Sequence, residues 1–387
     1  MSKLEELIEQ YCPDGVEWKP LGEATIMKRG TSATKGIMQE GDIPVISGGR
    51  QPAFYCNVSN RTGEVITVAG SGAGAGYVQY WNEPIFVCDA FSIQGNETLK
   101  TKYVYYILTN IQEKIYSTKK GGGVPHVHIS SIDKFEIPVP PLPVQEEIVR
   151  ILDAFTELQA ELQAELQNRK QQYNYYRDNL LSFKGRTDVE WKKLGEIASI
   201  KTGRRFVRTD IRESGVPCFH YGDIYTYYGL TATKTKGYLD EELAKKLRFA
   251  QPNDVVVVCA GENDMDIGVG VAWLGDEPAV VHDACCILHH NQSPRYISHF
   301  LRTHNYHLQM KKYVKNGKIS SLPASGLAEA LMPLPSLEEQ ERIASILDRF
   351  DSLTNDLAAG LPAEIEKRRQ QYEYYRDKLL TFKRKGA

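Results

Sequence analysis

The sequence predicts an α+β protein in which two tandem globular α/β domains are separated by two long helices. One long stretch, Val144–Lys184, recurs with the same residue pattern at Glu339–Lys383. The segment that opens the first half, Val16–Gly30, recurs as Val189–Gly203. Because both a helical and a globular segment are repeated, the whole half-chain is duplicated. A tandem duplication of this kind predicts a pseudo-two-fold molecule.

The first repeated stretch carries apolar residues three and four positions apart, which is typical of one face of a helix. These residues are Ile148, Ile151, Leu152, Phe155, Leu158, Leu162 and Leu166. About 40 helical residues at ~1.5 Å each would form a rod of about 60 Å. A helix with so narrow an apolar seam needs a partner surface. Its natural partner is its own copy, so we expect the two helices to pack as an antiparallel coiled coil.

The two helical copies differ in length by four residues. Gln145 aligns with Gln340 at an offset of 195 (340 − 145), whereas Gln171 aligns with Gln370 at an offset of 199 (370 − 171). An insertion of four residues shifts an apolar seam by about one helical turn and keeps it intact. We therefore expect the second helix to contain a stutter.

Short β-rich runs with Gly, Pro and Asn between them fill the rest of each half and predict a compact α/β domain. Each domain ends in a proline-rich segment, Pro138–Pro143 or Pro333–Pro335, which favours extended backbone before a helix. The expected boundaries are 1–143 for the first domain, 144–185 for the first helical region, 186–337 for the second domain and 338–387 for the second helical region.

Composition restricts the class of protein. The chain has 387 residues and a net charge of −2, so any surface for nucleic acid must be a local basic patch. Its seven cysteines form no CxxC framework, which indicates a reducing, cytoplasmic environment. The N-terminus does not resemble a signal peptide, and no apolar run reaches the ~18 residues of a membrane span.

The tandem halves, the helix openings PPLPVQEEIVRILD and PLPSLEEQERIASILD, and the motif QQYxYYRDxLLxFK in both helices carry a family resemblance. They resemble the specificity subunit (HsdS) of type I restriction-modification systems, over nearly the whole chain. The resemblance implies that each globular domain is a target recognition domain that reads one half of a bipartite double-stranded DNA target. It also implies that the helices are the family's conserved regions, which set the half-site spacing and dock two methyltransferase subunits. Restriction and translocase subunits would join through these.

The resemblance further implies that this chain has no catalytic activity, and that S-adenosylmethionine, ATP and Mg are needed only in the partner subunits. The sequence itself agrees, because it lacks a GxxxxGK[ST] phosphate loop. It also lacks the Asn-Pro-Pro-aromatic tetrapeptide of amino-methyltransferases and a convincing GxG for S-adenosylmethionine.

Basic loops at corresponding places in the two halves are candidates for phosphate contacts. The first pair follows the repeated opening motif, and the second pair precedes the proline-rich segment, where the family's matching loop lies near DNA. Solvated surface loops are the alternative. The candidates are Lys28, Arg29, Lys35, Lys119, Lys120, His126 and His128 in the first half and Lys201, Arg204, Arg205, Arg208, Lys311, Lys312, Lys315 and Lys318 in the second.

Two further groups of side chains are candidates for specific contacts. Arg50, Gln51, His220 and Tyr221 are candidates for contacts with base edges, since arginine and glutamine have the geometry for bidentate readout. The helices carry tyrosines beside arginine, a combination that protein interfaces prefer; packing between the two helices is the alternative. This partner-binding group is Tyr175, Tyr176, Arg177, Tyr374, Tyr375 and Arg376.

Two other functional classes compete with DNA recognition. One is a metal-dependent DNA-modifying or DNA-cleaving enzyme that would use the carboxylates of Asp254, Glu262, Asp264 and Asp266 to bind Mg²⁺. No lysine follows them at a plausible nuclease spacing, and the first half lacks them. The other is a coiled-coil scaffold without DNA contact.

Histidines and cysteines in the second half raise the question of zinc. His282, Cys285, Cys286, His289 and His290 lie close together in the sequence, but their spacing matches no standard ligand framework. A buried strand that holds small cysteines is the favoured interpretation, and no metal site is expected. Further along, His299, His304 and His307 are predicted to lie on an exposed helix face.

Overall fold

The computed structural model describes residues 3–33, 39–121, 123–261, 267–315, 317, 319–355 and 360–386. These residues form two compact units, and each unit takes segments from both halves of the chain. Unit 1 consists of Met1–Glu161 and Glu366–Ala387, and unit 2 of Leu162–Ile365. The globular domains are thus built together with pieces of the helical regions, within the described part of the chain.

The first domain contains two small sheets and a two-stranded ribbon. The larger sheet has the order β2-β8-β5-β6 and is antiparallel, and the smaller one has the order β4-β3-β7. Strand β5 is Val-Ile-Thr-Val-Ala and is buried along its whole length, as expected for a β-branched run covered on both faces. The strands are β1 (Glu17–Pro20), β2 (Ile26–Arg29), β3 (Ile43–Ile46), β4 (Phe54–Cys56), β5 (Val65–Ala69), β6 (Val78–Trp81), β7 (Phe86–Val87), β8 (Ala90–Gln94) and β9 (Glu136–Val139).

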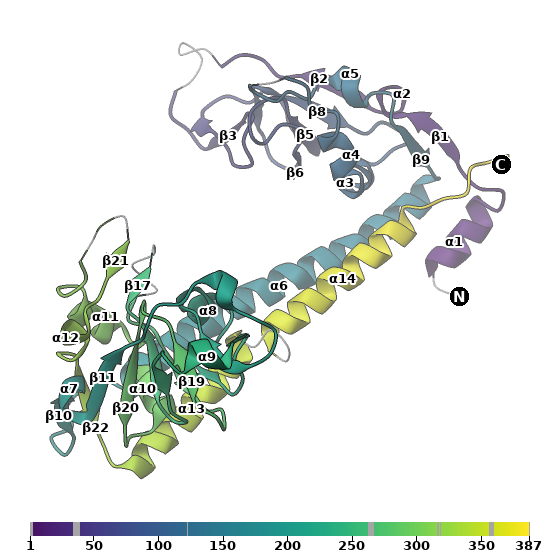
Figure 1. The fold of residues 1–387 in the computed structure, drawn as a ribbon. Coiled ribbons are helices and arrows are strands. Elements are labelled where there is room, and N and C mark those ends of the chain that lie inside the picture. Colours follow the sequence, from purple (N-terminus) through teal and green to yellow (C-terminus); the bar gives the residue numbers. More distant parts are fainter. Residues whose placement is uncertain are drawn as a thin grey trace. The chain divides into compact units, whose positions relative to one another are not determined.

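Helices cover this sheet and join it to the long helix α6 (Leu142–Leu180), as Figure 1 shows. Ile66 of β5, Tyr103 of α3 and Ile148 of α6 belong to one apolar core, and each has no exposed surface. Strand β9 pairs with β1 and leads directly into α6. The other helices of unit 1 are α1 (Lys3–Tyr11), α2 (Leu21–Ala24), α3 (Thr101–Asn110), α4 (Gln112–Tyr116) and α5 (Ile129–Ile132).

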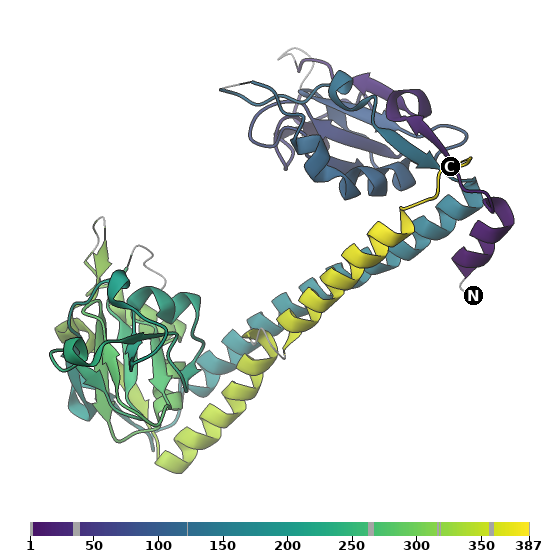
Figure 2. The ribbon, with the colours of Figure 1, turned by 45° about the vertical axis from the view of Figure 1, so that its right-hand side comes forward.

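The end of the chain closes unit 1. The N–H of Val16 donates to the carbonyl of Lys383 at 2.9 Å, and the N–H of Lys385 donates back to Val16 at 2.9 Å. Arg384 forms an ion pair with Glu136 of β9 and lies over the ring of Trp18. Figure 2 shows this C-terminal segment in yellow beside the purple start of the first domain.

The second domain repeats this plan with extra strands. Its larger sheet has the order β11-β20-β16-β18-β13, and its smaller sheet has the order β14-β12-β19-β15. Strand β16 is four valines, all of them fully buried. The strands are β10 (Glu190–Lys193), β11 (Ala198–Thr202), β12 (Val216–Phe219), β13 (Thr231–Ala232), β14 (Gly237–Leu239), β15 (Phe249–Ala250), β16 (Val255–Val258), β17 (Ala260–Gly261), β18 (Gly270–Trp273), β19 (Ala279–Val281), β20 (Cys285–His290), β21 (Ser320–Ser321) and β22 (Leu331–Leu334).

Helix α10 joins the second domain to the helical region, because it packs against both β18 and α13. Both of its sides are therefore covered, and the prediction that His299 lies on an exposed face is wrong. His299 is fully buried; its Nδ1 lies 3.2 Å from the hydroxyl of Tyr173 and its Nε2 lies 2.8 Å from a carboxylate oxygen of Asp348. The short helices of this domain are α7 (Leu194–Ile197), η1 (Arg208–Asp210), α8 (Tyr221–Thr226), α9 (Glu241–Ala244), α10 (Pro294–Phe300), α11 (His304–Met310) and α12 (Ala324–Leu327).

The second helical region is divided into two helices where the sequence predicts one. Helix α13 spans Leu337–Asn355, and α14 spans Leu361–Leu379. Pro362 is the second residue of α14, and proline is tolerated in the first turn of a helix but not in its interior, where its missing N–H would break the ladder. A second helix, α14, therefore begins at Leu361, close to the predicted insertion.

Each unit contains its own antiparallel helix pair. In unit 1, Phe155 of α6 contacts the rings of Tyr372 and Tyr375 of α14, at centroid distances of 6.3 and 5.6 Å. In unit 2, Tyr176 of α6 stacks on Phe350 of α13 at 5.4 Å. The repeated tyrosines thus bury one face against the partner helix in both copies. None of the helices in the described segments is long and apolar enough to cross a membrane.

Candidate nucleic-acid interface

Both globular domains have a concave site at the same place in the fold. In each, the loop that follows the first strand of the larger sheet folds back against the end of the smaller sheet. Thr31 N–H donates to Val87 in the first domain, and Arg204 N–H donates to Val281 in the second, both at 3.0 Å. The preceding residue is glycine in both copies. A Cβ on Gly30 would lie 2.0 Å from the carbonyl oxygen of Cys88, so only glycine permits this approach.

The site of the first domain is small and basic. Its cavity has a volume of about 190 Å³, and Arg29, Asp89, His126 and His128 are among its lining residues. The imidazoles of His126 and His128 are nearly parallel, with centroids 5.9 Å apart. Asp89 accepts a hydrogen bond from the hydroxyl of Ser71. The lining of this cavity therefore combines one arginine and two histidines with a carboxylate.

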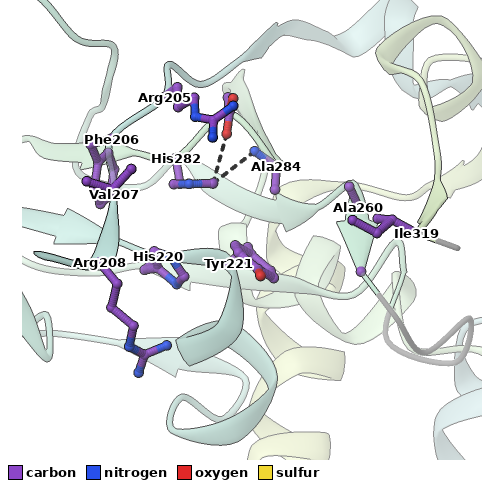
Figure 3. Close-up of a pocket in the computed structure, with 12 residues that line it drawn as sticks. Arg205, Phe206, Val207, Arg208, His220, Tyr221, Ala260, His282, Ala284 and Ile319 are labelled. Carbon is purple, nitrogen blue, oxygen red and sulfur yellow. Dashed lines mark hydrogen bonds and ion pairs between the residues drawn. The ribbon is translucent and has the colours of Figure 1, made fainter.

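The site of the second domain is larger and has an aromatic wall. Its volume is about 370 Å³. Figure 3 shows Arg205 and Arg208 together with the rings of Phe206, His220, Tyr221 and His282. The ring centroid of His220 lies 4.6 Å from that of Tyr221 and 4.8 Å from that of His282. Phe206 meets the ring of His282 edge-on at 5.1 Å. These side chains come from three separate segments, which the fold brings together.

Local hydrogen bonds hold the aromatic wall in place. Nδ1 of His220 lies 3.3 Å from the N–H of Gly222, where helix α8 begins, and Nδ1 of His282 lies 3.1 Å from the N–H of Ala284. Arg208 is held by Asp223, whose buried carboxylate also pairs with Lys236 at 3.1 Å. The two histidines of the wall are therefore held by backbone groups, and Arg208 lies beside them with its side chain 65% exposed.

The two imidazoles of this wall favour the neutral form. Burial lowers the pKa of His220, and the neighbouring His282 and Arg208 lower it further. Burial also lowers the pKa of His282; Asp283 opposes this shift and Arg205 adds to it. At neutral pH both rings are therefore uncharged, and the arginines supply the positive charge of the site.

The structure thus brings together part of the set of basic residues predicted for DNA. Arg29, His126 and His128 line one site, and Arg205, Arg208, His220 and Tyr221 line the other. Lys120 is next to the first site, because its backbone pairs with that of His126. In the same way Lys315 pairs with Ser321, two residues after Ile319 of the second site.

Other predicted residues lie outside the two cavities. The guanidinium of Arg204 donates to the carbonyl of Lys246, and Lys201 lines a separate hollow with Asp254 and His289. The cation of Arg50 lies over the ring of Tyr77. Lys35 and Lys318 lie outside the described residues. The remaining lysines are exposed or partly exposed; they are Lys28, Lys119, Lys311 and Lys312.

Sequence reasoning did not assign Phe206 and His282 to a DNA site. Neither is basic at neutral pH, and they are far from His220 along the chain. The only signal was that His282 stands beside an aspartate that recurs in both halves, Asp89 and Asp283. Cys285 and Cys286 are buried in strand β20, as predicted.

The described residues do not bring together the carboxylates that a metal-dependent enzyme would use. Asp254 is buried and accepts from the N–H of Gln251, with His289 at 2.7 Å. Glu262, Asp264 and Asp266 lie outside the described residues. Among the residues that are described, no group of three or more potential ligands could hold a metal ion.

The tyrosines predicted to bind partners are divided between two environments. Tyr176 and Tyr375 stack on the neighbouring helix, whereas Tyr175 and Tyr374 are 64% and 63% exposed. Arg177 and Arg376 lie over the rings of Tyr173 and Tyr372. An exposed tyrosine therefore stands at the corresponding place in each unit.

Comparisons with known proteins agree with this duplicated architecture. The family model described as type I restriction modification DNA specificity domain matches twice, at residues 13–169 and 187–367. The EcoR124I/EcoR124II type I restriction enzyme specificity subunit of Escherichia coli is 33% identical, over 99% of this chain and 97% of its own length. The EcoprrI specificity subunit of Escherichia coli is 28% identical, over 92% of each chain.

Solved structures show the same fold. The S subunit of a type I restriction-modification system from M. genitalium has a TM-score of 0.61 at 18% identity, over 95% of this chain and 96% of that chain. A chain from a solved structure of a type I R-M system, described in terms of complex assembly and conformational transition, also has a TM-score of 0.61. It is 17% identical, over 95% of this chain and 98% of that chain.

Proposed function

The chain belongs to the type I restriction-modification DNA specificity family, and we propose that its two concave sites each read one half of a bipartite duplex target. It is the non-catalytic specificity subunit, and methylation and cleavage are carried out by partner subunits. The observation that carries the proposal is the pair of arginine-containing cavities at equivalent places in two copies of one domain. A duplicated reader requires this arrangement, because each half-site needs its own site.

Two kinds of contact follow from the placement of the basic residues. The side chains that line the cavities are suited to base edges, since arginine and histidine carry hydrogen-bonding groups that match them. The lysines and arginines around the cavities are suited to phosphates, which position a protein on DNA without reading its sequence. The residues proposed to contact phosphates are Lys28, Lys119, Lys120, Lys201, Arg204, Lys311, Lys312 and Lys315.

The exposed tyrosines are the proposed docking points for methyltransferase subunits. Tyr175 and Tyr374 occupy corresponding helix positions, so two copies of one partner could each use one of them. The likeness to a chain of a type I system solved in connection with complex assembly supports such an association. Replacing both tyrosines by alanine should weaken co-purification of the methyltransferase subunit. Tyr11→Ala, at a 45% exposed tyrosine on α1, is the matched control and should leave co-purification unchanged.

Duplex binding at several salt concentrations tests the DNA proposal. The chain, assembled with its methyltransferase subunits, should bind its target more tightly than unrelated duplex and lose affinity steeply as salt rises. Lys201→Ala should weaken binding to both duplexes and reduce the salt slope by about one, as expected for the loss of one phosphate contact. Arg369→Ala, whose exposed side chain pairs with Glu366 on α14, is the control. Equal affinity for target and unrelated duplex would contradict the proposal.

A further inference from the structure

We infer that the aromatic cavity of the second domain takes a nucleobase that has left the stack of its duplex, and that the first domain captures no such base. The ligand class is an extruded nucleotide within the half-site read by the second domain. This inference rests on the proposed function and adds a mechanism of readout to it. It follows from the kind of surface that the cavity presents.

Aromatic rings form the wall of this cavity. Tyr221 and His282 have ring centroids 5.3 Å apart with planes tilted by 40°. The ring centroid of His220 lies 4.6 Å from that of Tyr221 and 4.8 Å from that of His282. A base inside a duplex has both faces covered by its neighbours and exposes only its edge. An unstacked base offers a free face, and stacking of such bases on aromatic side chains is a major source of affinity for unpaired nucleic acid. Phe206, His220 and His282 are buried behind this wall, at 3%, 7% and 9% exposed, and Tyr221 is partly exposed. The ring of Tyr221 is therefore the face that the wall offers to a base outside the stack.

The first domain provides an internal comparison. Strand β3 pairs in parallel with β7 in the first domain, as β12 pairs with β19 in the second, so the residues that follow these strands correspond. His220 and Tyr221 follow β12, and Ser47 and Gly48 follow β3. His282 follows β19, and Cys88 follows β7. Every aromatic side chain of this group is replaced by a small residue in the first domain.

The same replacement holds for the loop after the first sheet strand. Phe206 stands three residues after Gly203, and Ala33 stands three residues after Gly30. The backbone of the two sites is alike, because the loops dock through the same hydrogen bonds, so the difference lies in side chains that the second domain carries. The larger cavity, about 370 Å³ against about 190 Å³, is the one that carries Phe206 and Tyr221, whereas the rings of the smaller cavity include those of His126 and His128.

Charge at this cavity suits the phosphate of the extruded nucleotide. Arg205 and Arg208 line it together with Asp283, and the 65% exposed side chain of Arg208 lies 3.5 Å from the buried carboxylate of Asp223. Arginine binds phosphate through a planar fork of donors. One nucleotide could therefore contact the rings through its base and an arginine through its backbone.

Mismatch scanning of the target tests the inference. Extruding a base requires its pair to open, and a mismatched base opens at lower cost, so a protein that captures the base binds a mismatched site more tightly. With the chain assembled with its methyltransferase subunits, each pair of both half-sites is mismatched in turn by changing the opposite strand. We expect one position in the second domain's half-site to tighten binding by roughly tenfold. The half-site read by the first domain should contain no position at which a mismatch tightens binding through these rings.

Two double variants assign the effect to the rings. Tyr221→Ala with His282→Cys removes two rings and should bring the affinity ratio of mismatched to paired target close to one. Tyr221→Phe with His282→Phe keeps both rings and should retain the mismatch preference. Unchanged affinity of the first variant for the paired target shows that its domain folds. A mismatch preference that survives removal of the rings overturns the inference, and so does the absence of such a preference in the unaltered protein. In either case, sequence-specific binding of the paired target leaves the proposed function intact. Loss of that specific binding in the unaltered protein would overturn both.

Discussion

The side-chain oxygen of Gln145 accepts a hydrogen bond from the backbone N–H of Lys100 at 2.9 Å and ties the start of α6 to the start of α3 in the first domain. Its nitrogen donates to the carbonyls of Thr98 and Pro140, at 2.8 and 2.7 Å, and the residue has no exposed surface. Gln340 makes the corresponding bonds in unit 2, accepting from Ser293 and donating to Pro335. Each domain is thus locked to its own helix by one buried glutamine.

Replacing Gln145 by leucine should destabilise the protein by about 2–4 kcal/mol, because three hydrogen bonds are lost and buried backbone groups are left without partners. Gln340→Leu should act alike in unit 2. Gln171→Leu, at an exposed position of α6, is the matched control and should change stability by less than ~0.5 kcal/mol. Denaturant unfolding measures all three, and equal effects at buried and exposed glutamines would contradict this role.

Gly15 should tolerate no side chain, because it meets the C-terminal segment in a left-handed conformation. Its φ is +94°, and a Cβ would lie 2.5 Å from the carbonyl oxygen of Lys383. Gly63 has a φ of +73° with open space around it. Gly63→Ala should therefore cost about 1 kcal/mol for the backbone conformation alone, and Gly15→Ala should cost more. A smaller loss at Gly15 in thermal or denaturant unfolding would count against closure of unit 1 by the chain end.

Acid should destabilise unit 2 through its buried histidines. Burial lowers the pKa of His290 from 6.5 to about 4, with His289 adding to this shift and Asp254 and a backbone hydrogen bond with Gln292 opposing it. The unfolded chain then binds a proton that the folded chain excludes, so the free energy of unfolding falls as pH drops from about 6.5 toward 4. His290→Leu should flatten this slope, and His304→Leu, at an exposed site, should not. Denaturant titrations between pH 7.5 and 4.5 measure the effect; stability that rises on acidification would contradict it.

Much of the fold could be predicted from repetition and periodicity. The apolar spacing around Ile148 and Leu152 predicted the helix, and both residues are fully buried in the core of unit 1. Strand β16 falls within the short β-rich runs expected in each half, and its four valines are all buried. The division between α13 and α14 was not foreseen, because the repeat carried the pattern across Pro362 while the local effect of proline prevailed.

The candidate site was harder to predict, because it depends on contacts between distant segments. Phe206, His220 and His282 are separated along the chain, and only the pairing of β12 with β19 brings the last two together. The position of His299 was also not foreseen. A histidine is accommodated in a core when its ring nitrogens have partners, and Tyr173 and Asp348 come from helices far away in the sequence.

The length of the second helical region should set the spacing between half-sites. Deleting four residues from the second helical region, so that Gln340–Gln370 matches Gln145–Gln171 in length, would remove the equivalent of about 6 Å of helix at ~1.5 Å per residue. This length is close to two base pairs at ~3.4 Å each. We expect the spacer in the target to change while both half-site sequences stay the same. Mapping of modified bases measures this; a spacer of unchanged length would contradict the role of the helices as a ruler.

Exchange of one domain tests the central claim most directly. Residues Met1–Pro143 would be replaced by the corresponding domain of a relative, and the modified bases of a host that expresses the hybrid with its methyltransferase subunit would be mapped by long-read sequencing. The account predicts a bipartite motif in which one half changes and the other half is retained. A change in both halves, or a single uninterrupted motif, would contradict it.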